Sequence, residues 1–130
     1  MNVLFVCTEN AGRSQIAEHL FNAAGGGHHR ARSAGTRPRD SVYPDVVQTL
    51  GRRGMDATRA RPKALTTDLL EWADRVVTMG CDDECPVTGK PTEDWELPDV
   101  RGASPEGVEK IAEEIDRRMA RLLEELGPEA

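Results

Sequence analysis

Apolar residues follow two different spacings along the 130-residue chain. Short apolar runs and alternations are typical of strands, and they predict four of them, at 3–6, 31–34, 75–79 and 94–97. Apolar residues that recur every three or four positions predict helices, which begin near Ser14, Pro44, Thr66 and Ser104. Because strands and helices alternate, we expect a three-layer α/β fold, a four-stranded parallel sheet with helices on both faces. At this length, one domain over residues 1–130 is expected.

Composition and charge narrow the functional classes. The formal net charge is -6 and the isoelectric point is about 5.1, so we expect no general binding of nucleic acid and none of acidic membranes. No stretch reaches the roughly 18 apolar residues of a membrane span, and the first strand begins where a signal peptide would lie. We therefore expect a cytoplasmic protein. In that compartment its three cysteines favour catalysis or redox exchange over a disulfide framework.

The segment that joins the first strand to the first helix carries the candidate chemistry. Cys7 stands at the end of the strand, five residues separate it from Arg13, and the helical pattern begins at Ser14. A strand, a tight loop and a helix direct several free backbone N–H groups, and the positive end of the helix dipole, toward one place. The segment therefore predicts a site for a tetrahedral oxyanion, formed by Thr8, Glu9, Asn10, Ala11, Gly12, Arg13 and Ser14.

Cys7 is predicted to be a nucleophile that attacks the bound oxyanion. The positive field of the loop, reinforced by Arg13, should make the thiolate available at neutral pH. The guanidinium of Arg13 would bind two anion oxygens at once, and the Ser14 hydroxyl could hydrogen-bond the sulfur. Gly12 and Asn10 are residues that tolerate unusual or closely packed backbone. A buried, inert cysteine is the competing interpretation, and the strand end and the start of a helix both count against it.

Two further groups of side chains are of types that can bind metal. His28 and His29 are neighbours on an extended segment, so their side chains point in opposite directions. Cys81 and Cys85 lack the two further ligands that a zinc site needs. We therefore expect no metal and no cofactor. The two cysteines follow a strand at positions i and i+4, which favours redox exchange between thiols, with two small buried apolar side chains as the alternative.

At these residues the chain resembles a known family. The segment VCTENAGRSQ, together with Arg32-Ser33-Ala34-Gly35 and Val76-Val77-Thr78-Met79, looks like the low-molecular-weight protein tyrosine phosphatase fold, and in particular like its arsenate reductase branch. Gln15 stands where the tyrosine phosphatases usually have proline, which favours the reductase branch. The resemblance extends over nearly the whole chain.

The resemblance implies roles for several residues. Asp99 matches the family's general acid, although an Asp after a Pro is more often a turn residue or helix cap when judged alone. Asn10 and Ser33 match residues that support the anion loop in the reductases. Some reductases bind potassium near this loop through an acid, and here Lys63 falls near that position, so we expect no required metal.

The resemblance also implies a relay of thiols. Cys7 would attack arsenate, Cys81 would attack the sulfur of Cys7 and release arsenite, and Cys85 would then form a disulfide with Cys81. An external reductant would reopen that disulfide. In the well-known relay members the second and third cysteines stand further apart than here, so both thioredoxin and a small thiol such as mycothiol are candidate reductants.

Three functions are compatible with these residues. Arsenate reduction accounts for the anion loop, Gln15, the two later cysteines and Asp99 together, and we favour it. A phosphotyrosine phosphatase would use the same loop through a phosphocysteine, but Val100 and Arg101 follow the acid where those enzymes usually carry aromatic residues. A non-catalytic oxyanion or redox sensor is the third. Weak phosphatase side activity is expected of the reductase, because phosphate and arsenate are near isosteres.

Overall fold

A computed structural model describes residues 1–25, 27–81, 85–86 and 88–127. The described strands form one parallel sheet with the order β2-β1-β3-β4: β1 (Asn2–Cys7), β2 (Arg30–Gly35), β3 (Arg75–Thr78) and β4 (Thr92–Asp94). The helices are α1 (Arg13–Ala24), α2 (Pro44–Arg52), α3 (Thr67–Trp72) and α4 (Pro105–Leu126). Within the described ranges, no helix has the length and apolar character that crossing a bilayer requires.

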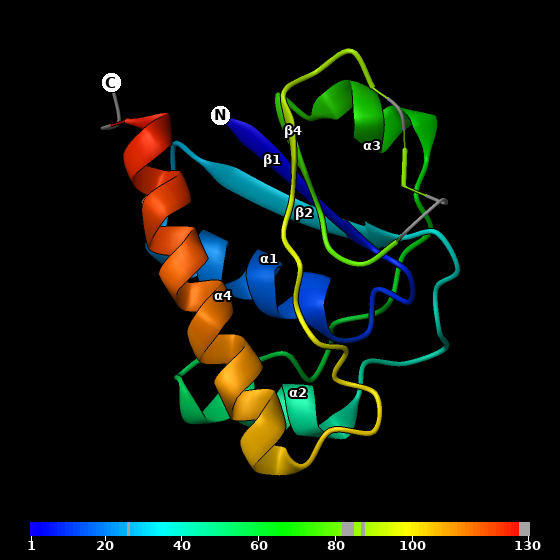
Figure 1. Ribbon diagram of the computed structural model, residues 1–130, viewed down its shortest axis with the longest axis vertical. Helices are drawn as coiled ribbons and strands as arrows, with labels where there is room; N and C mark the ends of the chain where they lie inside the picture. The colour runs from blue at the N-terminus through cyan, green and yellow to red at the C-terminus, as the bar shows by residue number, and fades with distance from the viewer. Residues whose placement is uncertain (26, 82–84, 87, 128–130) are drawn as a thin grey trace.

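Helices cover both faces of the sheet (Figure 1). The central strand β1 is buried on both sides, and its alternate residues enter two different apolar clusters. Phe5 faces α1 and α4, where it packs with Phe21 and Met119. Val6 faces α3, where it packs with Leu69. The predicted three-layer α/β fold is confirmed, and it places the carboxyl ends of the parallel strands at one edge.

Two helices begin directly after a capping hydroxyl side chain. The hydroxyl of Thr66 accepts a hydrogen bond from the backbone N–H of Leu69, and α3 follows. The hydroxyl of Ser104 accepts one from the N–H of Gly107, and α4 follows with Pro105 in its first turn. These side chains satisfy N–H groups that the helix itself leaves unpaired.

The predicted fourth strand at 94–97 is wrong in its position. The strand β4 covers Thr92–Asp94, and Asp94 is paired with Thr78 at the end of β3. After Thr78 the chain turns at Gly80, whose φ is 82°, and among the described residues β3 does not continue far enough to pair with those after Trp95. The apolar alternation at 94–97 reflects core packing instead, because the Trp95 ring is buried and lies 5.7 Å from the ring of Phe5.

Lys90 ties the segment before β4 to the end of α3. Its ammonium donates to the carbonyl oxygens of Leu70, Glu71 and Ala73, which lie at the helix terminus where carbonyls lack helical partners and a cation is favoured. We expect Lys90→Met to lower the free energy of unfolding by about 1–2 kcal/mol in urea denaturation. The matched control is Lys110→Met on the exposed side of α4. Equal losses in the two variants would contradict this role of Lys90.

Candidate active site

The loop between β1 and α1 surrounds the sulfur of Cys7. The Ser14 hydroxyl lies 2.8 Å from Cys7 Sγ, and the backbone N–H of Asn10 donates to the same sulfur at 3.2 Å. Asn10 adopts a φ of 51°, which is one of the conformations that asparagine tolerates. Cys7 is 2% exposed and unpaired with another cysteine. The predicted contact between Ser14 and the sulfur is confirmed, and the two hydrogen-bonding groups orient the sulfur within the loop.

Gln15 and Lys63 hold Asn10 in its unusual backbone conformation. The Gln15 amide donates to both the backbone and side-chain oxygens of Asn10, at 3.2 Å each, and to the carbonyl of Arg61. The Lys63 backbone N–H donates to Asn10 Oδ1 at 2.8 Å, while the Asn10 amide donates to Ser14 Oγ. The sequence identified Gln15 only as a mark of the reductase branch. Its structural role in the loop depends on distant residues and had no local signal.

The resemblance implied that Ser33 supports the anion loop, and its hydroxyl hydrogen-bonds a residue of α1 rather than Asn10. In the parallel register Ser33 pairs with Phe5, two residues before the strand end, so it lies beneath α1. Its hydroxyl donates to Glu18 Oε1 at 2.8 Å, and the Glu18 carboxylate pairs with the Lys63 ammonium at 3.5 Å. Ser33 is therefore linked to the loop through Glu18 and Lys63. Within the described residues, no three His, Cys, Asp or Glu side chains gather as a metal site would require.

Arg13 and Asp99 lie next to each other at the loop. Arg13 Nη2 lies 3.6 Å from Asp99 Oδ2, and Nη1 donates to the Leu97 carbonyl at 3.0 Å. Asp99 also accepts a hydrogen bond from the N–H of Arg101, so it is a turn residue as well as a neighbour of the anion loop. Arg13 is buried and the Asp99 side chain is 39% exposed. A carboxyl at this position can reach an oxygen of an anion that Arg13 binds.

Gly12 lets the segment around Asp99 pack directly on the anion loop. A Cβ at position 12 would overlap Val100 Cγ2, while Val100 Cβ lies 3.3 Å from that point. We expect Gly12→Ala to weaken the binding of inorganic phosphate about tenfold, because overpacking of this size costs on the order of 1–3 kcal/mol. Adding Val100→Ala should restore most of the affinity, with Val100→Ala alone as the control. Calorimetric titration measures all three, and a double variant no better than Gly12→Ala would contradict the contact.

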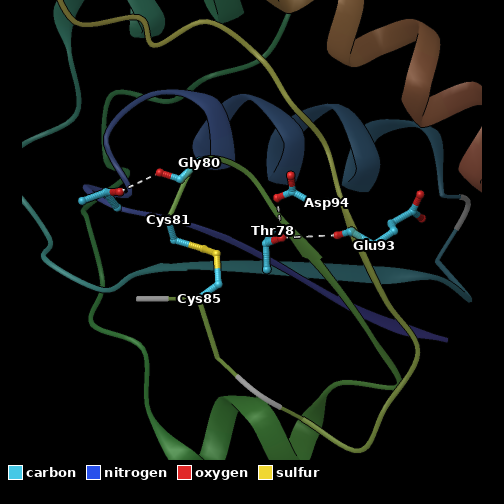
Figure 2. The surroundings of a disulfide bond; sticks show 7 residues. Thr78, Gly80, Cys81, Cys85, Glu93 and Asp94 are labelled. Carbon is cyan, nitrogen blue, oxygen red and sulfur yellow. Dashed lines mark hydrogen bonds between the residues drawn. A yellow bond between two sulfur atoms is a disulfide. The ribbon is translucent and has the colours of Figure 1, made fainter. Parts of the chain in front are cut away.

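The two later cysteines form a disulfide close to the loop (Figure 2). The Cα atoms of Cys81 and Cys85 lie 5.0 Å apart. Cys81 follows Gly80 directly, and the Gly80 carbonyl accepts a hydrogen bond from the Thr8 hydroxyl at 3.0 Å, so the disulfide begins one residue from a contact with the anion loop. Gly80 also lies against the Arg13 guanidinium, which a Cβ at position 80 would overlap. The residues at 82–84, within the predicted redox segment, lie outside the described ranges.

A cavity of about 650 Å³ lies beside Arg13. Cys85 borders it, whereas Cys81 is 3% exposed and packs in the apolar cluster beneath α3. Its other lining residues are Thr78, Gly80, Asp94, Glu96, Leu97 and Asp99. Of the two bonded cysteines, Cys85 is therefore the more exposed residue. The site as a whole brings together an unpaired cysteine sulfur, a strand-to-helix loop, a carboxyl group and a disulfide.

Comparison with known proteins agrees with this geometry. The family model described as low molecular weight phosphotyrosine protein phosphatase matches residues 2–130. The chain is 30% identical to an arsenate reductase of Bacillus subtilis, with 94% of each chain covered. It is 42% identical to the solved thioredoxin-dependent arsenate reductase of Corynebacterium glutamicum, with a TM-score of 0.81. That match covers 95% of this chain and 60% of the reductase chain.

A second solved structure, the low molecular weight protein tyrosine phosphatase from T. tengcongensis, has a TM-score of 0.87 and 30% identity, with 96% of this chain and 99% of that chain covered. The α/β fold of this chain is thus shared with both kinds of relative. The chain belongs to the low molecular weight phosphotyrosine protein phosphatase family.

Proposed function

We propose that the protein is an arsenate reductase in which Cys7 is the nucleophile and Cys81 and Cys85 supply the two electrons. The observation that carries this proposal is the Cys81–Cys85 disulfide, which begins next to Gly80 at the wall of the anion loop. A phosphatase needs the loop and an acid, whereas a reductase needs thiols near the adduct as well. The names of the relatives from Bacillus subtilis and Corynebacterium glutamicum support the same activity.

The reaction follows from the positions of these groups. Arsenate binds to the loop N–H groups and Arg13, and the Cys7 thiolate attacks arsenic. One arsenic–oxygen bond breaks as a sulfur–arsenic bond forms, and the departing hydroxyl takes a proton from Asp99 and leaves as water. The Cys81 thiolate then attacks Cys7 Sγ. The sulfur–arsenic bond breaks with its electron pair on arsenic, so arsenic(V) becomes arsenite, arsenic(III), and a Cys7–Cys81 disulfide forms.

Cys85 completes the cycle. Its thiolate attacks the sulfur of Cys81, the Cys7 thiolate leaves, and the disulfide is now between Cys81 and Cys85, the arrangement in this structure. We propose a redoxin of the thioredoxin type as reductant in the cytoplasm, with a small thiol as the alternative. Attack at Cys85 is favoured because this residue borders the cavity while Cys81 is buried.

Phosphotyrosine phosphatase is the second candidate, since Arg13 and Asp99 would serve it equally well and a tyrosine phosphatase is among the similar structures. A direct comparison separates the two. Arsenate-dependent NADPH oxidation with thioredoxin and thioredoxin reductase should exceed hydrolysis of p-nitrophenyl phosphate by at least about tenfold in kcat/KM. If p-nitrophenyl phosphate is hydrolysed rapidly while arsenate causes no NADPH oxidation, either with thioredoxin or with a small thiol, the protein would be assigned to the phosphatases.

A further inference from the structure

Polar side chains from three segments meet at the mouth of the anion loop. The Tyr43 hydroxyl, just before α2, donates to Glu9 Oε1 at 2.7 Å. Arg101 Nη1 lies 3.9 Å from the other oxygen of Glu9, and Arg101 Nη2 lies 4.0 Å from Asp99 Oδ2. We call Tyr43, Glu9, Arg101 and Asp99 the rim bridge. It connects the loop that binds the anion with the segment that carries the acid.

The two ends of the rim bridge are fixed to different degrees. Burial and then the hydrogen bond to Glu9 raise the pKa of Tyr43 above its usual value, so its hydroxyl remains a donor at neutral pH. The Arg39 guanidinium lies 4.1 Å from the centre of the Tyr43 ring and covers it. Arg101 is 70% exposed and its two ion pairs are long, so it is the member that can most readily be displaced or removed.

The rim bridge has different consequences for two kinds of substrate. Attack by Cys7 requires the leaving oxygen to point away from the sulfur, toward Asp99. In free arsenate or phosphate this oxygen carries at most a proton. In an aryl ester it carries a ring, which would lie among Asp99, Arg101 and Glu9 and would remove water from these charged groups without replacing their hydrogen bonds.

We propose that Arg101, held between Glu9 and Asp99, is a specificity-determining residue that favours free tetrahedral oxyanions over oxyanions that carry an aromatic ring. The inference rests on the proposed function for the identity of the oxyanion, arsenate, and it assigns to the same site the rejection of phosphotyrosine-like esters. The sequence shows only that Arg101 stands where an aromatic residue is usual in the phosphatases. The structure adds its two carboxylate partners.

Binding measurements test this without any reduction step. In a Cys7→Ser background, calorimetry gives the dissociation constants of phenyl phosphate and inorganic phosphate, and the first divided by the second measures discrimination against the ring. Arg101→Ala should tighten phenyl phosphate and lower the ratio about tenfold. Arg101→Met should lower it further, because it adds apolar surface for the ring. Arg121→Ala removes an exposed arginine on α4 and should leave the ratio unchanged.

The possible outcomes are distinct. An unchanged ratio in both Arg101 variants would overturn the proposal, and so would an equal loss of affinity for both probes, because Arg101 would then be an ordinary anion ligand. If phenyl phosphate does not bind the Cys7→Ser protein, measurable binding after Arg101→Ala supports the proposal and continued absence of binding overturns it. Failure of the wild-type protein to reduce arsenate would overturn the proposed function but would leave this ratio interpretable.

Discussion

Replacing Cys7 with Ser should abolish arsenite formation, with a loss of roughly 10⁴-fold or more in kcat. A serine hydroxyl is a weak nucleophile without a general base, and the groups near the sulfur, Ser14 and the N–H of Asn10, do not supply one. The loop itself should remain intact, so the affinity for inorganic phosphate should change by no more than about threefold. The coupled NADPH assay and calorimetry measure the two quantities.

A retained rate within about tenfold of wild type would mean that another thiol attacks arsenate first. Cys81 would then be the candidate, since it follows Gly80 at the wall of the loop. A large loss of phosphate affinity in Cys7→Ser would instead indicate that the substitution had disturbed the loop. Ser14→Ala removes the hydroxyl next to the sulfur but keeps the thiol, so it is the matched variant for that case.

Replacing Cys85 with Ser should leave the first turnover intact and lower steady-state turnover about 10³-fold or more. Arsenite is released when Cys81 attacks Cys7, so one equivalent should still appear, with the protein left as a Cys7–Cys81 disulfide. In contrast, Cys81→Ser should block even the first release of arsenite, because the buried Cys81 is the thiol next to the loop. Rapid-quench measurement of arsenite, with peptide mapping of the disulfide, distinguishes the variants.

Normal steady-state turnover by Cys85→Ser with thioredoxin would contradict this order of steps. The reductant would then act on the Cys7–Cys81 bond, and the disulfide seen here between Cys81 and Cys85 would not belong to the catalytic cycle. Normal turnover only with a small thiol would point to transfer of the arsenic adduct to that thiol.

Local sequence patterns were sufficient to predict the centre of the site. The strand that ends in Cys7 and the helix from Arg13 are consecutive in the chain, so hydrophobic spacing located the loop that we propose as the anion site. The contact between Ser14 and the sulfur followed from the same short segment. The approach of Asp99 to Arg13 needed the family resemblance, because nothing near residue 99 indicates its distant partner.

The remaining features depend on how distant elements pack. The position of β4 is set by its pairing with β3 and by the turn at Gly80. Apolar alternation around Trp95 carries no information about either. The register of β2 places Ser33 beneath α1, next to Glu18, and a slip of one position would have moved it to the other face. The rim bridge and the ammonium of Lys90 join residues that are far apart in sequence, and they have no periodic signal.

A single-turnover experiment tests the proposed thiol relay most directly. Fully reduced protein is mixed with excess arsenate in the absence of any external thiol, arsenite is quantified, and the disulfides are mapped by mass spectrometry. The relay predicts about one arsenite per chain, with Cys81 and Cys85 joined and Cys7 free. No arsenite from fully reduced protein, or one equivalent without a bond between Cys81 and Cys85, would contradict it.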